Sequence, residues 1–143
     1  MIAAIPVSVP EELLGVPEIT HVSFDTRRLE IQVMACHAAE PEYLAAGYCL
    51  FAACAGFRVL EEGDLLEFWA LEPRPSGWLW HIQSGGWLAQ EKQREGFFSS
   101  RPSGPNWPSP QEFLVVGQEY CVSVLAHREP TIWVAEPFIG SSA

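Results

Sequence analysis

Apolar and polar side chains alternate with a period of two near the start of the chain. In residues 29–35, the apolar residues Leu29, Ile31 and Val33 are separated by polar or flexible ones. This period is typical of a β-strand with one buried face. Residues 20–24 form a second such run, separated from the first by a short polar break. The pattern predicts a β-hairpin.

Further β-rich runs follow the same logic. Residues 65–71 and 78–83 flank a turn rich in proline and glycine, which predicts a second hairpin. Three more apolar runs, residues 112–116, 120–126 and 131–135, are separated by short polar segments. Their spacing predicts a C-terminal meander of three strands.

Two segments favour helix. Residues 37–46 contain good helix formers after Pro41, and proline is well tolerated in the first turn of a helix. Residues 88–98 are helical in composition and include a glycine after two basic residues, typical of a helix C-terminus. Residues 47–60 contain two largely apolar runs around Gly56, and fit either one buried strand with a bend or a helix followed by a strand.

These elements predict a single α+β domain spanning residues 1–143. It is mainly an antiparallel sheet, built from hairpins and a C-terminal meander, with one or two short helices. Residues 1–19 are interrupted by prolines and are expected to be irregular or to form a short edge element. Residues 101–110 contain four prolines and are expected to form a loop, and residues 136–143 a frayed tail.

Composition supports a stable core and gives no sign of a metal or cofactor. The chain of 143 residues is 48% hydrophobic and contains six tryptophans, which favours an aromatic-rich globule. Its four cysteines are Cys36, Cys49, Cys54 and Cys121. Three lie in apolar surroundings and are expected to be reduced and buried, the alternative being two disulfides. No pair has the spacing of a zinc knuckle.

The sequence also bears on location. The longest apolar run, residues 47–57, is shorter than the roughly 18 residues of a membrane span. The N-terminus has no basic region before its apolar residues and is interrupted by prolines, unlike a secretory signal. We therefore expect a cytoplasmic protein that makes no membrane contact.

The charge is concentrated in one half of the chain. The net charge is −10, of which residues 1–72 carry −9 and residues 73–143 carry −1. Lys92 is the only lysine, which argues against nucleic acid as a partner because phosphate binding requires clustered cations. The imbalance favours a basic protein partner. The alternative is that the acidity serves solubility alone.

Candidate contact residues lie in and around this acidic half. The carboxylates nearest one another in sequence are Glu61, Glu62, Asp64, Glu67 and Glu72. Trp107 lies within a proline-rich loop, where an aromatic side chain is a candidate interface anchor. The remaining tryptophans of the region, Trp69, Trp78, Trp80 and Trp87, are expected in the core, with a sugar-binding face as the alternative.

Three segments carry a resemblance to the small acidic immunity proteins encoded with bacterial polymorphic toxins. They are F-R-V-L-E-E-G-D-L-L-E-F-W at 57–69, G-W-L-W-H-I-Q-S-G-G-W at 77–87 and R-E-G-F-F-S-S at 94–100. The resemblance is one of type: a short, acidic, aromatic-rich chain without a catalytic signature. It implies an inhibitor that occludes a basic toxin with its acidic surface.

Two other functions stay open. No serine-hydrolase or phosphate-loop motif is present, but carboxylates with His81 or His127 in a cleft would suit a small hydrolase. A Cys121–His127 or Cys36–His37 pair is a weaker candidate. A large exposed apolar patch would instead favour a structural or assembly subunit.

Overall fold

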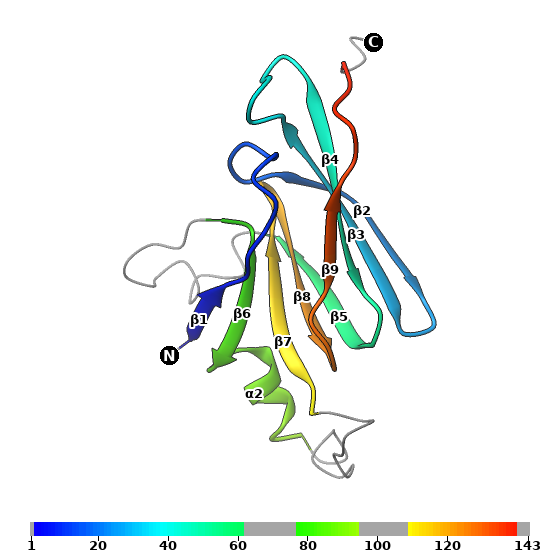
Figure 1. Ribbon diagram of the computed structural model, residues 1–143. Helices are drawn as coiled ribbons and strands as arrows, with labels where there is room; N and C mark the ends of the chain where they lie inside the picture. The colour runs from blue at the N-terminus through cyan, green and yellow to red at the C-terminus, as the bar shows by residue number, and fades with distance from the viewer. Residues whose placement is uncertain (1, 62–76, 95–108, 140–143) are drawn as a thin grey trace.

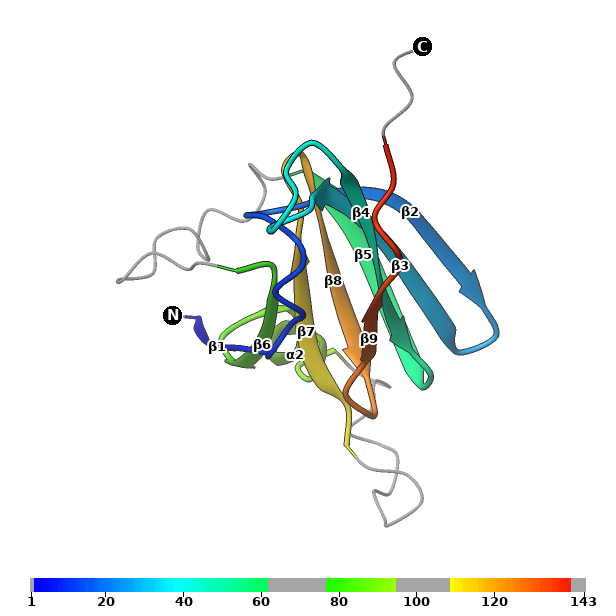
Figure 2. The same ribbon diagram turned by 45° about the horizontal axis from the view of Figure 1, so that its top comes forward.

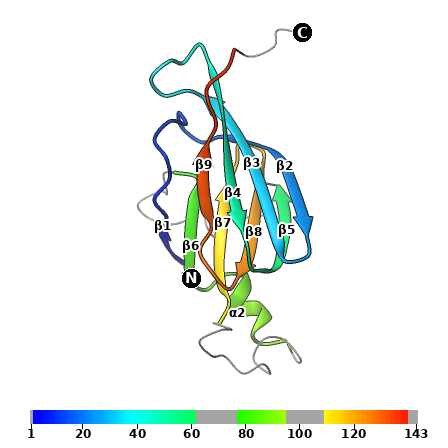
Figure 3. The same cartoon turned by 45° about the vertical axis from the view of Figure 1, so that its right-hand side comes forward.

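Two antiparallel β-sheets packed face to face make up the fold (Figure 1). The computed structural model describes residues 2–61, 77–94 and 109–139. One sheet has five strands in the order β1-β6-β7-β8-β5, and the other has four in the order β2-β3-β4-β9. Figures 2 and 3 show the four-stranded sheet lying over the five-stranded one.

The elements have the following bounds. The five-stranded sheet contains β1 (Ala3–Pro6), β6 (Leu79–Ser84), β7 (Gln111–Val116), β8 (Tyr120–Ala126) and β5 (Cys54–Glu61). The four-stranded sheet contains β2 (Glu18–Asp25), β3 (Arg28–Cys36), β4 (Leu44–Phe51) and β9 (Thr131–Val134). A short helix, α2 (Trp87–Glu91), links β6 to the chain that leads to β7.

The first predicted hairpin is confirmed. Strands β2 and β3 pair from Glu18 with Met34 to Asp25 with Arg28. The two turn residues, Thr26 and Arg27, have φ angles of 40° and 74°. A two-residue hairpin turn with both φ angles positive matches the right-handed twist of the strands, so non-glycine residues adopt this conformation here despite its steric cost.

The main core lies between the two sheets. Alternate residues of β3, among them Leu29, Ile31 and Val33, are fully buried. They pack in one cluster with the inward-facing residues of β7 and β8. Phe51 and Phe113 meet across the interface with ring centroids 5.4 Å apart. The alternation of apolar and polar residues in β3 therefore identifies the side chains that this strand contributes to the core.

The central strands β7 and β8 of the five-stranded sheet are buried on both faces. A second cluster on its outer face contains Trp80, Ile82, Leu114, Val116 and Cys121. Burial on both faces accounts for the continuous apolar runs of β7 and β8, which differ from the alternating pattern of β3. Trp78 and Trp80 are 2% and 8% exposed, so both belong to the core and neither displays a sugar-binding face.

The helix predicted after Pro41 is wrong. Residues 37–43 are a loop and β4 follows from Leu44, paired with β3 on one side and β9 on the other. Ala45, Cys49 and Phe51 are buried on its inner face. Helix propensity in this alanine-rich segment is outweighed by the apolar area that strand pairing buries. Residues 47–60 adopt neither of the two predicted forms. The chain reverses direction within this segment, between the end of β4 and the start of β5.

The C-terminal meander is correct for two of its three strands. Strands β7 and β8 pair as a hairpin, but β9 joins the other sheet beside β4. Both edges of β8 are already occupied by β5 and β7, so no edge remains for β9. The loop at residues 127–130 therefore carries the chain from one sheet to the other.

The other elements differ from expectation in extent. Helix α2 ends at Glu91, earlier than predicted, and residues 95–98 lie outside the described residues. Strand β6 is confirmed, and it pairs with β1 and β7. Its predicted hairpin partner, residues 65–71, and most of the 101–110 loop lie outside the described residues. Phe138 is not frayed, since it exchanges two backbone hydrogen bonds with Leu44.

The architecture is mostly antiparallel β-sheet with little helix, so the α+β description overstates the helical part. The short edge element expected in residues 1–19 is β1, which forms one margin of the five-stranded sheet. Within the described residues, no helix is long and apolar enough to span a membrane.

Candidate functional site

Exposed carboxylates gather at one end of the sandwich. This acidic end comprises Glu11, Glu12, Glu18, Glu40, Glu42, Glu61, Glu119 and Glu136, all of them exposed. They lie in loops or at strand ends: before β2, between β3 and β4, at the end of β5, between β7 and β8, and after β9. In Figure 1 the β3–β4 loop and the segment after β9 lie together at the top.

Backbone hydrogen bonds join these segments. Ala38 N donates to Glu12 O at 2.8 Å, which ties the loop before β2 to the β3–β4 loop. Gln118 N donates to Pro17 O at 3.0 Å, which ties the β7–β8 turn to the start of β2. Glu61 lies opposite Tyr120 in the β5–β8 ladder, next to that same turn. The acidic end is thus one connected surface that includes both sheets.

The described cations lie elsewhere. Arg27 and Arg28 form the β2–β3 turn, Lys92 and Arg94 follow α2, and Arg128 lies in the β8–β9 loop. All of these segments are at the opposite end of the strands. Arg58 lies in the middle of β5. Arg94 forms an ion pair with Glu91 at 2.8 Å, beside α2. The acidic end is therefore not neutralised by the described cations.

The structure places one of the predicted contact residues on this surface. Glu61 is exposed at the last position of β5. The other predicted contacts, Glu62, Asp64, Glu67, Glu72 and Trp107, lie outside the described residues. Sequence reasoning missed Glu40, Glu119 and Glu136 because they are far apart along the chain and only strand order brings them together. The charge imbalance between the two halves was the available signal.

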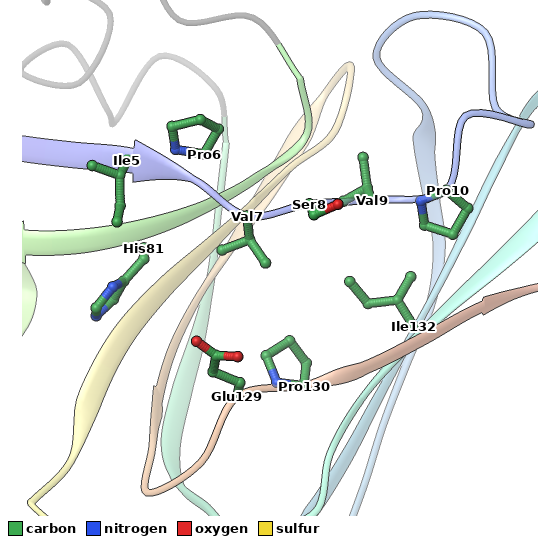
Figure 4. Close-up of a pocket in the computed structure, with 10 residues that line it drawn as sticks. All are labelled: Ile5, Pro6, Val7, Ser8, Val9, Pro10, His81, Glu129, Pro130 and Ile132. Carbon is green, nitrogen blue, oxygen red and sulfur yellow. The ribbon is translucent and has the colours of Figure 1, made fainter.

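A groove lies between the edge strands β1 and β9, where the two sheets separate (Figure 4). Its volume is about 620 Å³, within the range of small-molecule sites. Most of the side chains that line it are apolar and come from the segment Ile5–Pro10 and from Pro130 and Ile132, although polar atoms make up more than half of its exposed surface. The polar side chains among them are Ser8, His81 and Glu129.

The two candidate histidines differ in position. His81 lines the groove and its ring stacks on Phe113, with centroids 5.2 Å apart. His127 is 8% exposed and its backbone N donates to Ala53 O. Cys121 is about 20 Å from His127 along β8, because six residues separate them at about 3.3 Å each. The structure therefore separates this pair, whereas it brings His81 and Glu129 into one groove.

The cysteines are free, as expected. Cys36 is exposed and the other three are buried. Burial raises the pKa of Cys49 to about 12 and, against the lowering effect of a backbone hydrogen bond with Gly56, the pKa of Cys54 to about 11. Both thiols thus stay protonated near neutral pH and are poor nucleophiles and poor metal ligands. Among the described residues, no three His, Cys, Asp or Glu side chains are grouped to hold a metal ion.

A buried carboxylate on the outer face of the five-stranded sheet has a structural role. Glu112 of β7 is 4% exposed, and its Oε1 accepts a hydrogen bond from Leu88 N at 2.8 Å. Gly86, at the N-cap of α2, offers no side-chain cap. Glu112 thus satisfies a backbone donor at the start of α2 in place of a cap. Arg58 lies 4.7 Å above the Trp87 ring beside it.

The buried carboxylate of Glu112 is expected to make the stability of the protein depend on pH. Burial raises the pKa of Glu112 above its ordinary value of 4.5, against the lowering effects of the Leu88 and Trp87 N–H groups and of Arg58. The native state therefore binds this proton more tightly than the unfolded state, so the contribution of Glu112 to stability falls as pH rises from 4.5 through the raised pKa.

In the variant Glu112→Gln, the side chain at position 112 is neutral in both the native and the unfolded state. The pH-dependent contribution of this side chain to stability should therefore be absent. We expect the free energy of unfolding of the wild type, measured relative to Glu112→Gln by urea denaturation, to decrease between pH 4 and pH 7. A difference that stays constant, or that grows with pH, would show that the carboxylate is not desolvated as described.

Comparison of the chain with protein-family models, curated proteins and solved structures found no match in any of the three.

Proposed function

We propose that the protein binds a basic protein partner through the acidic end and occludes the partner's functional surface. The observation that supports this most directly is the separation of charge: eight exposed carboxylates at one end and the described lysine and arginine residues elsewhere. Soluble proteins ordinarily intersperse charges of both signs on their surfaces. A surface of one sign attracts and orients a partner of the opposite sign.

The proposed class is that of an immunity protein acting on a toxin. The resemblance noted above supports it. Toxins that act on phosphate-containing substrates need cationic clefts, and an acidic, rigid surface built on strand ends fits such a cleft. A reading frame for a basic protein directly upstream of this gene would add independent support.

A small hydrolase is the second candidate, since His81 and Glu129 line one groove. Acid–base catalysis works best when the histidine is held by a second group. Among the described residues, no hydrogen bond links these two side chains, and the ring of His81 is held by stacking on Phe113. Binding is therefore the better supported function.

Charge reversal tests the proposal. In the variant Glu40→Lys/Glu42→Lys, both changes lie in the exposed β3–β4 loop, where they should leave the core intact. The partner is first captured from a lysate of the source cell by pull-down at low salt. We expect association with it to slow by on the order of tenfold at low salt and to depend less on ionic strength, because electrostatic steering is lost. Stopped-flow fluorescence measures both quantities.

A matched control carries the same change of charge at the opposite end. The variant Asp25→Lys/Glu30→Lys alters residues beside the β2–β3 turn and should keep the wild-type association rate to within about twofold. The triple reversal of Glu61, Glu62 and Asp64 to lysine extends the test to the segment that the sequence indicates. Equal slowing by the control and the acidic-end variant would mean that net charge alone governs association, which contradicts the proposal.

A further inference from the structure

The groove between β1 and β9 has the features of a small-molecule site, independently of the acidic end. Its volume of about 620 Å³ can accommodate a compact ligand, and the groove is open to solvent along one side. Val7, Pro130 and Ile132 provide apolar walls from both sheets (Figure 4). The imidazole of His81 is fixed at the other side by its stacking on Phe113. The site is therefore preformed by the fold.

The charge in the groove is of one sign. Glu129 is the only carboxylate among the lining residues, and no lysine or arginine lines the groove. Figure 4 shows the Glu129 carboxylate turned toward the side on which His81 lies. No ion pair between described residues involves Glu129. Its charge is thus available to a ligand.

An added β-strand is a poor fit to the same groove. Pro6, Pro10 and Pro130 line it, and proline has no backbone N–H to offer an incoming peptide. Strand β9 has four residues, and short edge strands flanked by proline are typical of edges protected against strand addition. The lining consequently favours a compact molecule recognised by its apolar surface and its charge.

We propose that this groove binds a small apolar molecule that carries one positive charge. Its ammonium group donates hydrogen bonds to the Glu129 carboxylate. Its apolar part packs against Val7, Pro130 and Ile132, displacing water from them. Charge-assisted hydrogen bonds of this kind are shorter and stronger than neutral ones, so the charge sets specificity and the apolar side chains add to the affinity.

The probe is 2-phenylethylammonium, titrated into the ¹⁵N-labelled chain and followed by amide chemical shifts. We expect saturable shifts at the groove residues, including His81 and Ile132. Neutral 2-phenylethanol should bind about tenfold more weakly, and 3-phenylpropanoate should not bind. The variant Glu129→Gln should weaken the ammonium probe by about tenfold and leave 2-phenylethanol unaffected. The matched control Glu136→Gln, at the acidic end, should bind like the wild type.

Three results would overturn the proposal. The first is that the groove residues do not shift with the ammonium probe. The second is that 2-phenylethanol binds as tightly as the ammonium probe, which would make the groove a purely apolar site. The third is that Glu136→Gln weakens the ammonium probe as much as Glu129→Gln does, which would mean that the probe responds to overall charge. A wild-type amide spectrum for Glu129→Gln away from the groove shows that the fold is intact.

Discussion

The substitution Phe113→Ala is expected to lower the free energy of unfolding by about 3 to 5 kcal/mol. Phe113 is fully buried and contacts Phe51 of the facing sheet, 5.4 Å between ring centroids, as well as His81, 5.2 Å away. Its removal leaves a cavity between the two sheets that the facing strands cannot close. A typical domain is stable by only about 5 to 15 kcal/mol, so the variant should be close to unfolding.

Urea denaturation followed by tryptophan fluorescence measures this loss. The control is Phe24→Ala, because Phe24 is 51% exposed and contacts only the rim of the core through Phe57. It should cost less than about 1 kcal/mol. Similar losses for the two variants would mean that the sheets do not pack through Phe113.

The substitution Gly117→Ala is expected to destabilise the protein by about 1 to 3 kcal/mol. A Cβ atom at this position would lie 2.6 Å from the backbone O of Tyr120 and 2.9 Å from the Ile19 side chain. The Gly117 N–H donates to that same oxygen at 2.9 Å. The carbonyl therefore cannot move away without breaking the β7–β8 turn, which also carries Glu119 to the acidic end.

A second glycine provides the matched control. A Cβ atom at Gly56 would meet its nearest neighbour, the Trp87 side chain, at 3.9 Å, an ordinary contact distance. Thermal unfolding followed by circular dichroism should therefore show little change for Gly56→Ala and a clear decrease in Tm for Gly117→Ala. If Gly117→Ala is as stable as Gly56→Ala, the turn differs from the one described.

The strands could be predicted from the sequence where one face is buried and the other exposed. In β3, the alternation of Leu29, Ile31 and Val33 with polar residues is sufficient to identify a strand. It fails in β4, where Ala45 and Ala46 are both buried, so no alternation remains and helix propensity misleads. Which sheet a strand joins cannot be predicted locally, and β9 pairs with β4, about 80 residues earlier in the chain.

The sign of the charge at the candidate site could be predicted from the sequence, whereas the set of residues that forms the site could not. The charge imbalance indicates an acidic surface, and Glu61 lies on it. The contributions of Glu119 and Glu136 depend on strand order, since both come from the half of the chain whose net charge is only −1. The groove also depends on strand order, because it combines residues that follow β1 with Glu129 of the β8–β9 loop.

Hydrogen–deuterium exchange of the complex with the captured basic partner tests the central claim most directly. The account predicts that binding slows exchange in the loops at residues 11–16, 37–43 and 117–119, which form the acidic end, and leaves the β2–β3 turn and residues 127–130 unchanged. Protection at that turn and at residues 127–130, with exchange at the acidic end unaffected, would contradict the account.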